Sequence, residues 1–149
     1  MKLGIVSDHR GYKLKEELKK ELERKGFLVL DFGTNSEERI DFPDYAFPFG
    51  EKIKEKEFDL GIAICGTGIG MSIALNKVKG VMCAKINNET DAIGAKGHNH
   101  ANALAFSSEL TGEEIIHFID LFLTTEFNED QSYERRINKI LAYEERNES

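Results

Sequence analysis

The chain has few of the residues that mark disulfide-linked, fibrous or disordered proteins. Of its 149 residues only two are cysteine and two are proline, and tryptophan is absent. Cys65 and Cys83 each lie in an apolar run, and we expect free thiols in a reducing compartment. The scarcity of proline and the lack of any low-complexity tract exclude the disordered and fibrous classes.

Long hydrophobic runs and an excess of positive charge are also missing. The apolar stretch Leu3–Val6 gives way at once to polar Ser7–Arg10, and a membrane helix needs roughly 20 apolar residues. Lys and Arg number 20 against 27 Asp and Glu, a formal net charge of −7. A field of that sign repels phosphate backbones and anionic lipids. We therefore expect a cytoplasmic protein that binds neither nucleic acid nor membrane.

What is present is a regular alternation of apolar and amphipathic segments, without hairpin signals. The length fits a single domain over residues 1–149. The expected strands are Leu3–Ser7, Phe27–Asp31, Phe58–Cys65, Val81–Lys85 and Ala101–Phe106. The expected helices are Lys13–Lys25, Pro43–Lys56, one from the glycine-rich turn to Val78, Asn88–Lys96, one that starts at a Thr111/Glu114 capping box, and Ser132–Arg146. Within the second of these helices, Pro48 should cause a kink or delay the start.

Five strands separated by helices predict a Rossmann-like, three-layer α/β/α fold with a five-stranded parallel sheet and a C-terminal helix. We expect the common strand order 2-1-3-4-5. In such sheets ligands bind beyond the carboxyl ends of the strands, where the order reverses, here between strands 1 and 3. The segments that leave those two strand ends are Ser7–Gly11 and Cys65–Gly70. These segments are the candidate site.

The turn Cys65-Gly66-Thr67-Gly68-Ile69-Gly70 joins a strand to a helix. Backbone N–H groups at a helix amino end suit an oxyanion or a phosphate, although a plain tight turn has the same glycines. The spacing does not match the dinucleotide or P-loop fingerprints. A cysteine phosphatase would carry an arginine where Met71 stands. Cys65 ends its strand at the helix amino end, where the thiolate is favoured, so it is a candidate base or nucleophile. Cys83 fits an inert, buried thiol better.

Histidines mark both ends of the expected sheet. His9 follows Asp8 at the end of strand 1, a pairing typical of a ligand site. His98 precedes strand 5 and so belongs to the amino edge, roughly 17–20 Å from the carboxyl edge that holds Cys65. If His98 and Cys65 serve one site, His98 must come from a partner subunit, most economically in a two-fold dimer. A metal site made of His98, His100 and His9 is a weaker alternative.

Several short motifs occur together in order: Ser7-Asp8-His9-Arg10-Gly11, Asp31-Phe32-Gly33-Thr34, Ile64–Ser72, Asn76-Lys77 and Gly97-His98-Asn99. Together they resemble the type B ribose-5-phosphate isomerase and galactose-6-phosphate isomerase family over essentially the whole chain. The resemblance implies an aldose–ketose isomerase that works through an enediol, without metal or cofactor, on a small sugar phosphate. It also implies a homodimer with shared active sites, which could pair into tetramers.

The resemblance also implies a role for each matched residue. Cys65 would move the proton between C1 and C2 of the open-chain sugar, and Thr67 would help to hold the enediolate. His98 of the neighbour, beside Asn99, would assist ring opening, and Asp8 would hold sugar hydroxyls. The remaining expected contacts are the amides of Gly66, Gly68, Ile69 and Gly70 for the oxyanion, and His9 and Arg136, with Arg10 adjacent, for the phosphate.

Three positions depart from the family pattern. Phe42 stands where a tyrosine is usual, and Ser132 and Glu109 stand where arginines are usual. Losing two cationic contacts should weaken phosphate binding, because charge-assisted bonds contribute about 1.5–3 kcal/mol each. Ribose 5-phosphate and ribulose 5-phosphate remain the leading pair. The alternatives are another or an unphosphorylated sugar, a non-catalytic sugar-phosphate-binding relative, and a thiol-dependent phosphatase.

Overall fold

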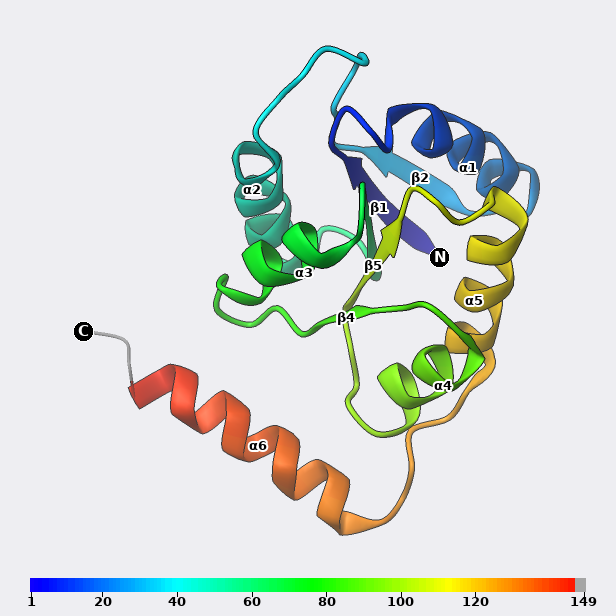
Figure 1. The fold of residues 1–149 in the computed structure, drawn as a ribbon. Helices are drawn as coiled ribbons and strands as arrows, with labels where there is room; N and C mark the ends of the chain where they lie inside the picture. Colours follow the sequence, from blue (N-terminus) through cyan, green and yellow to red (C-terminus); the bar gives the residue numbers. More distant parts are fainter. Residues whose placement is uncertain (147–149) are drawn as a thin grey trace.

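The computed structural model describes residues 1–146, in which strands and helices alternate along the chain (Figure 1). The strands are β1 Lys2–Ser7, β2 Leu28–Asp31, β3 Leu60–Cys65, β4 Cys83–Lys85 and β5 Ala103–Ser107. The helices are α1 Tyr12–Arg24, α2 Phe42–Lys54, α3 Ile69–Asn76, α4 Glu89–Gly97, α5 Gly112–Thr124 and α6 Gln131–Arg146.

All strand pairs are parallel and helices cover both faces of the sheet, which confirms the predicted three-layer α/β/α architecture. On one face, buried residues of α1, α4 and α5 pack against β1, β3 and β5, with Leu18 and Phe118 among them. On the other face, α2 and α3 contribute Phe49 and Leu75 to a second core. Helices on both faces keep the strands from water, so each strand reads as a nearly continuous apolar run.

The predicted strand order 2-1-3-4-5 is wrong in its last two places, because the sheet runs β2-β1-β3-β5-β4. β5 is buried over four of its five residues and pairs with β3 and β4. β4 has three half-buried residues, and such a short strand is better suited to an edge. The Asn76 side chain bonds the Cys83 N–H and C=O at 2.8 and 2.9 Å, which occupies groups that an edge strand leaves free. β1 and β3 remain neighbours, so the candidate segments still meet.

Most element boundaries lie within two residues of those predicted. The fourth strand, expected from Val81, begins only at Cys83, because the Val81 N–H bonds back to the Val78 carbonyl and the Met82 N–H bonds to the Asn102 side chain. Of the two effects expected of Pro48, a kink or a delayed start, the delayed start does not occur, because α2 starts at Phe42 and continues through Pro48. The capping box of α5 is confirmed, with reciprocal bonds between Thr111 and Glu114.

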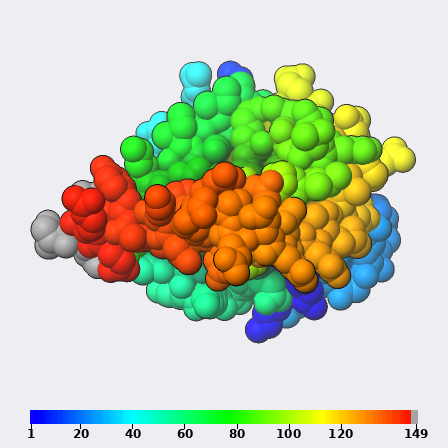
Figure 2. Space-filling view, turned by 90° about the horizontal axis from the view of Figure 1, so that it is seen from below, coloured from blue at the N-terminus to red at the C-terminus, as the bar shows by residue number. Residues whose placement is uncertain are grey.

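Helix α6 lies apart from both cores. None of its residues is buried, and Ile140, Leu141 and Tyr143 are exposed. In Figure 1 it runs along the lower edge of the molecule, drawn in orange and red, and in Figure 2 it crosses the face seen from below. No helix in residues 1–146 combines the length and apolar character of a membrane span.

Candidate active site

The turn between β3 and α3 is built on a left-handed glycine. Gly68, the N-cap of α3, has a φ of 80°, which L residues rarely adopt. A Cβ atom there would also lie 3.0 Å from the carbonyl carbon of Phe106. The tight turn therefore depends on glycine, and it places the amino end of α3 directly after Cys65.

The Cys65 side chain is buried at this helix end. The Gly68 N–H donates to its Sγ at 3.2 Å, so the sulfur accepts a hydrogen bond from the turn that follows it. The Thr67 hydroxyl accepts from the Ile69 N–H at 3.1 Å. Among residues 1–146, the N–H groups of Thr67 and Gly70 have no hydrogen-bond acceptor. Two free amides beside a sulfur base are the arrangement that an oxyanion intermediate needs.

The β1–α1 turn supplies the opposite wall. Asp8 is 7% exposed, and its Oδ1 accepts from the Gly11 N–H at 3.0 Å, which fixes the carboxylate at the head of α1. The Arg10 side chain lies against Gly66, where an added Cβ would come within 2.9 Å of its Cδ. A cavity of about 180 Å³ lies between these two turns; its lining is Asp8, Arg10, Phe42, Cys65, Gly66, Thr67 and Gly70.

The Phe42 ring closes this cavity at the α3 side. Its Cζ would lie 2.7 Å from a Cβ on Gly70, so the ring approaches the backbone of the turn as closely as glycine allows. Phe42 therefore gives this cavity an apolar wall without a hydroxyl.

His9 is half-buried beside the cavity. Its Nδ1 accepts from the Ile40 N–H at 3.2 Å. A nitrogen that accepts carries no proton, so in the neutral imidazole Nε2 is the donor. The loop that precedes α2 thus orients His9 and sets which nitrogen can donate to a ligand.

His98, Asn99, Ser132 and Arg136 form a second group at the other end of the molecule. His98 caps the carboxyl end of α4 and stacks on the Tyr133 ring, with centroids 4.4 Å apart. The Arg136 guanidinium carbon lies 5.5 Å from the centroid of that ring. Asn99 Nδ2 donates to the Gly94 carbonyl at 3.3 Å, and the Ser132 N–H donates to Asp130 Oδ1 at 2.8 Å.

The structure does not bring these two groups together within one chain. His98 precedes β5, whereas Cys65 ends β3, and the two strands run parallel. Figure 1 shows α6 and the end of α4 far from the turn that precedes α3. His9 and His98 are separated in the same way, and no three His, Cys, Asp or Glu side chains within residues 1–146 are placed to hold a metal ion. The alternative metal site made of His98, His100 and His9 is not assembled.

The two thiols differ in their surroundings. Burial raises the pKa of Cys83 to about 12, and its hydrogen bond to Ser72 offsets only part of that rise. Cys83 therefore stays a protonated thiol near neutral pH, as predicted for a structural cysteine. Both cysteines are free.

Two contacts of the site were not predicted from the sequence. Ser107 Oγ donates to the Gly66 carbonyl at 2.7 Å and accepts from the Glu109 N–H at 3.0 Å, so β5 braces the glycine turn. Tyr133 carries the stack with His98. Neither a serine at a strand end nor a tyrosine in the first turn of a helix has a distinctive pattern, so no sequence signal identified these two residues.

Comparison with known proteins gives concordant results. The model of the Ribose/Galactose Isomerase family matches residues 3–140. The ribose-5-phosphate isomerase B of Escherichia coli is 38% identical over 146 residues, 97% of each chain. The ribose-5-phosphate isomerase B structure of Clostridium thermocellum superposes with a TM-score of 0.92 at 41% identity, covering 98% of this chain and 99% of that one. The enzyme of Mycoplasma genitalium with bound ribulose-5-phosphate gives 0.88 at 41% identity, covering 97% and 96%.

Proposed function

Because this chain belongs to the ribose/galactose isomerase family, we propose that it is an aldose–ketose isomerase that interconverts ribose 5-phosphate and ribulose 5-phosphate. The names of its relatives and the ribulose-5-phosphate bound to the Mycoplasma genitalium enzyme support this substrate pair. Both sugars share one enediolate, so a single base and an oxyanion site suffice for the reaction. The proposed enzyme works in the cytoplasm, where free thiols persist.

The observation that carries the proposal is the position of Cys65. Its sulfur lies at the amino end of α3 and lines the same cavity as Asp8 and Thr67. In the proposed reaction the Cys65 thiolate removes the C2 proton of the open-chain aldose and returns it to C1. The charge that develops on oxygen is held by the free N–H groups of Thr67 and Gly70. Stabilisation by fixed amides requires no metal ion or cofactor.

The remaining wall of the cavity selects the sugar. Asp8 is held by the Gly11 amide and presents a carboxylate that can accept from sugar hydroxyls. His9, with Nε2 as donor, and the exposed Arg10 add groups that suit an anionic substituent. In the proposed orientation the reacting carbons lie at Cys65 and the phosphate lies towards His9, which is outside the cavity lining.

We further propose that the site is completed by a second copy of the chain. His98, Asn99, Ser132 and Arg136 of the partner subunit would close the cavity around Cys65 in a two-fold dimer. Within one chain, His98 and Cys65 lie at opposite edges of the sheet, so they can share a site only if one of them comes from a second chain. The unburied helix α6, with its exposed Ile140 and Leu141, supports the dimer as well. Sedimentation distinguishes this dimer from a tetramer formed by two dimers.

A second candidate substrate is a sugar with a less charged terminus. Ser132 stands where the family motif has arginine, and exposed Glu109 adds an acid near the β5 end. In the proposed dimer site, where Ser132 of the partner subunit would join Glu109, fewer cations favour a sugar that carries its phosphate at another position or carries none.

The test is a substrate panel. Pentose and hexose phosphates and their unphosphorylated forms are incubated with the wild-type protein and with Cys65→Ala, and ketose formation and phosphate release are measured with and without chelator. Isomerisation of ribose 5-phosphate that requires Cys65 and survives chelation is expected. Phosphate release without isomerisation would establish the phosphatase alternative, and inactivity towards every sugar would leave only sugar-phosphate binding.

A further inference from the structure

The His98 and Tyr133 rings lie parallel, with 5° between their planes and 4.4 Å between their centroids. The two residues come from different elements, the carboxyl cap of α4 and the first turn of α6. Stacked aromatic pairs stabilise one another beyond the area that they bury. This contact is one of the ties between α6 and the body of the protein.

The imidazole of His98 has little else to orient it. Its side chain is exposed, and within residues 1–146 the ring makes no hydrogen bond. The backbone N–H of His98 is held by the Gly94 carbonyl at 3.0 Å, which fixes the main chain but not the orientation of the ring. The Tyr133 ring is therefore the contact that sets the plane of the imidazole.

The same ring also holds Arg136. Arg136 lies about one helical turn after Tyr133 in α6, and its guanidinium carbon is 5.5 Å from the centroid of the Tyr133 ring. His98 and Arg136 thus both contact a single aromatic side chain. In a ribofuranose 5-phosphate the two groups to be recognised are also neighbours, because the ring oxygen is attached to C4 and the phosphate to C5. A group that protonates the ring oxygen and a group that holds the phosphate must therefore lie side by side.

We propose that Tyr133 is a positioning residue that delivers His98 and Arg136 together to the site of the partner subunit. This inference rests on the proposed isomerase function. In the ring-opening step the C1–O4 bond breaks, O4 takes a proton from the imidazole, and the C1 hydroxyl loses its proton to solvent as the aldehyde forms. The position of the imidazole ring matters in that step. It does not matter in the later proton transfer at Cys65.

The experiment separates these two steps. Ribulose 5-phosphate cannot close a five-membered ring, because its O5 is esterified, so exchange of its C1 proton with D2O reports on Cys65 without ring opening. Isomerisation of ribose 5-phosphate reports on both steps. Tyr133→Leu removes the flat ring but keeps apolar bulk and helix propensity, and Tyr133→Phe is the matched control that keeps the ring. Oligomeric state is measured by sedimentation for each variant.

For Tyr133→Leu we expect the rate of isomerisation to fall on the order of tenfold to hundredfold relative to the rate of exchange, because a slightly misplaced group costs that much. Tyr133→Phe should keep both rates near wild type. Equal losses in both reactions, or no loss in either, would overturn the proposal. Wild-type protein that neither isomerises nor exchanges would instead show that the proposed function is wrong, and the inference would fall with it.

A second measurement does not depend on activity or assembly. The Tyr133 ring current should shift the carbon-bound proton signals of the His98 imidazole upfield in NMR spectra, with the signals assigned by their loss in His98→Gln. The shift should persist in Tyr133→Phe and vanish in Tyr133→Leu. His98 signals that are unshifted in the wild-type protein would refute the stack.

Discussion

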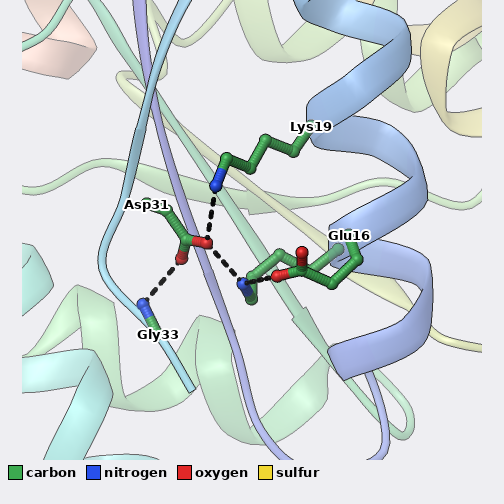
Figure 3. Close-up of polar contacts among 5 residues, drawn as sticks. Glu16, Lys19, Asp31 and Gly33 are labelled. Carbon is green, nitrogen blue, oxygen red and sulfur yellow. Dashed lines mark hydrogen bonds and ion pairs between the residues drawn. The ribbon is translucent and has the colours of Figure 1, made fainter. Parts of the chain in front are cut away.

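Lys15 and Asp31 form a buried ion pair that joins α1 to the carboxyl end of β2. The Lys15 Nζ lies 2.7 Å from Asp31 Oδ2, and the Lys15 side chain is 0% exposed. Figure 3 shows the Asp31 carboxylate between the Lys19 amine and the Gly33 N–H. Asp31 Oδ1 also accepts from the Gly33 N–H at 2.9 Å, and the Gly33 carbonyl accepts from the Ser7 N–H at 2.7 Å. The pair therefore braces the backbone that leads into Asp8, one wall of the candidate site.

This pair predicts an unequal response to single and double substitutions. Asp31→Leu leaves the buried Lys15 ammonium with Glu16, at 2.8 Å, as its remaining ion-pair partner. We expect it to lower the free energy of unfolding by about 3–5 kcal/mol, because a buried charge loses its principal partner. Lys15→Met combined with Asp31→Leu should cost clearly less than the sum of the two single changes. Urea unfolding of the four proteins measures this, and strict additivity would contradict the coupling.

The same carboxylate predicts a loss of stability in acid. Burial raises the pKa of Asp31, but the hydrogen bonds from Lys15 and Gly33 and the charges of Lys15 and Lys19 together lower it below its ordinary 3.8. The folded state thus binds the proton less readily than the unfolded state. Its stabilisation is present above pH 3.8 and is lost as the pH falls through the lower, folded pKa. Unfolding free energies measured down to about pH 2 should fall more steeply for wild type than for Asp31→Asn.

Replacement of Cys65 should separate catalysis from binding. Cys65→Ala removes the proposed base and leaves the amides of the turn, so isomerisation should be abolished while ligand affinity changes only a few-fold. Cys83→Ala is the matched control and should keep turnover, since its thiol is protonated near neutral pH. Steady-state kinetics and calorimetric titration measure the two effects. Near wild-type turnover of Cys65→Ala would rule out this base.

A shared site predicts complementation between inactive chains. Cys65→Ala and His98→Ala dimers, each inactive alone, should regain about a quarter of wild-type activity after subunit exchange, because half of the random dimers hold one intact site. Exchange is verified by mass spectrometry of differently labelled chains. A mixture that stays inactive after complete exchange would show that the two residues do not meet across an interface.

If Arg136 and Ser132 lie at the phosphate of the substrate, substitutions of these two residues should have opposite effects. Arg136→Ala should raise the KM for a pentose phosphate with less effect on kcat, because a remote phosphate contact is made in ground and transition states alike. Ser132→Arg should lower that KM, by up to about tenfold for each 1.4 kcal/mol recovered. Unchanged kinetics of Arg136→Ala on the best substrate would contradict a phosphosugar. A Ser132→Arg protein impaired on that substrate would indicate a remodelled pocket.

Local pattern was enough to predict most helices and strands of this protein and to single out the turn after Cys65 as the candidate site. The capping box at Thr111, the glycine turn after Cys65 and the apolar strands depend on neighbouring residues, which a sequence displays directly. The rule that parallel strands share their carboxyl edge then placed His98 and Cys65 at opposite ends without any coordinates.

Only the tertiary structure decided features that depend on competition between distant segments. The segments that form β4 and β5 both read as strands in the sequence. Their order in the sheet depends on which of them is long and apolar enough to be buried between two neighbouring strands. The burial of Lys15 depends on Asp31 arriving from another element, since a lysine in an amphipathic helix normally faces water. The stack of Tyr133 on His98 likewise depends on where α6 returns to the body. Such contacts join residues far apart in the chain, and no local pattern encodes their distance.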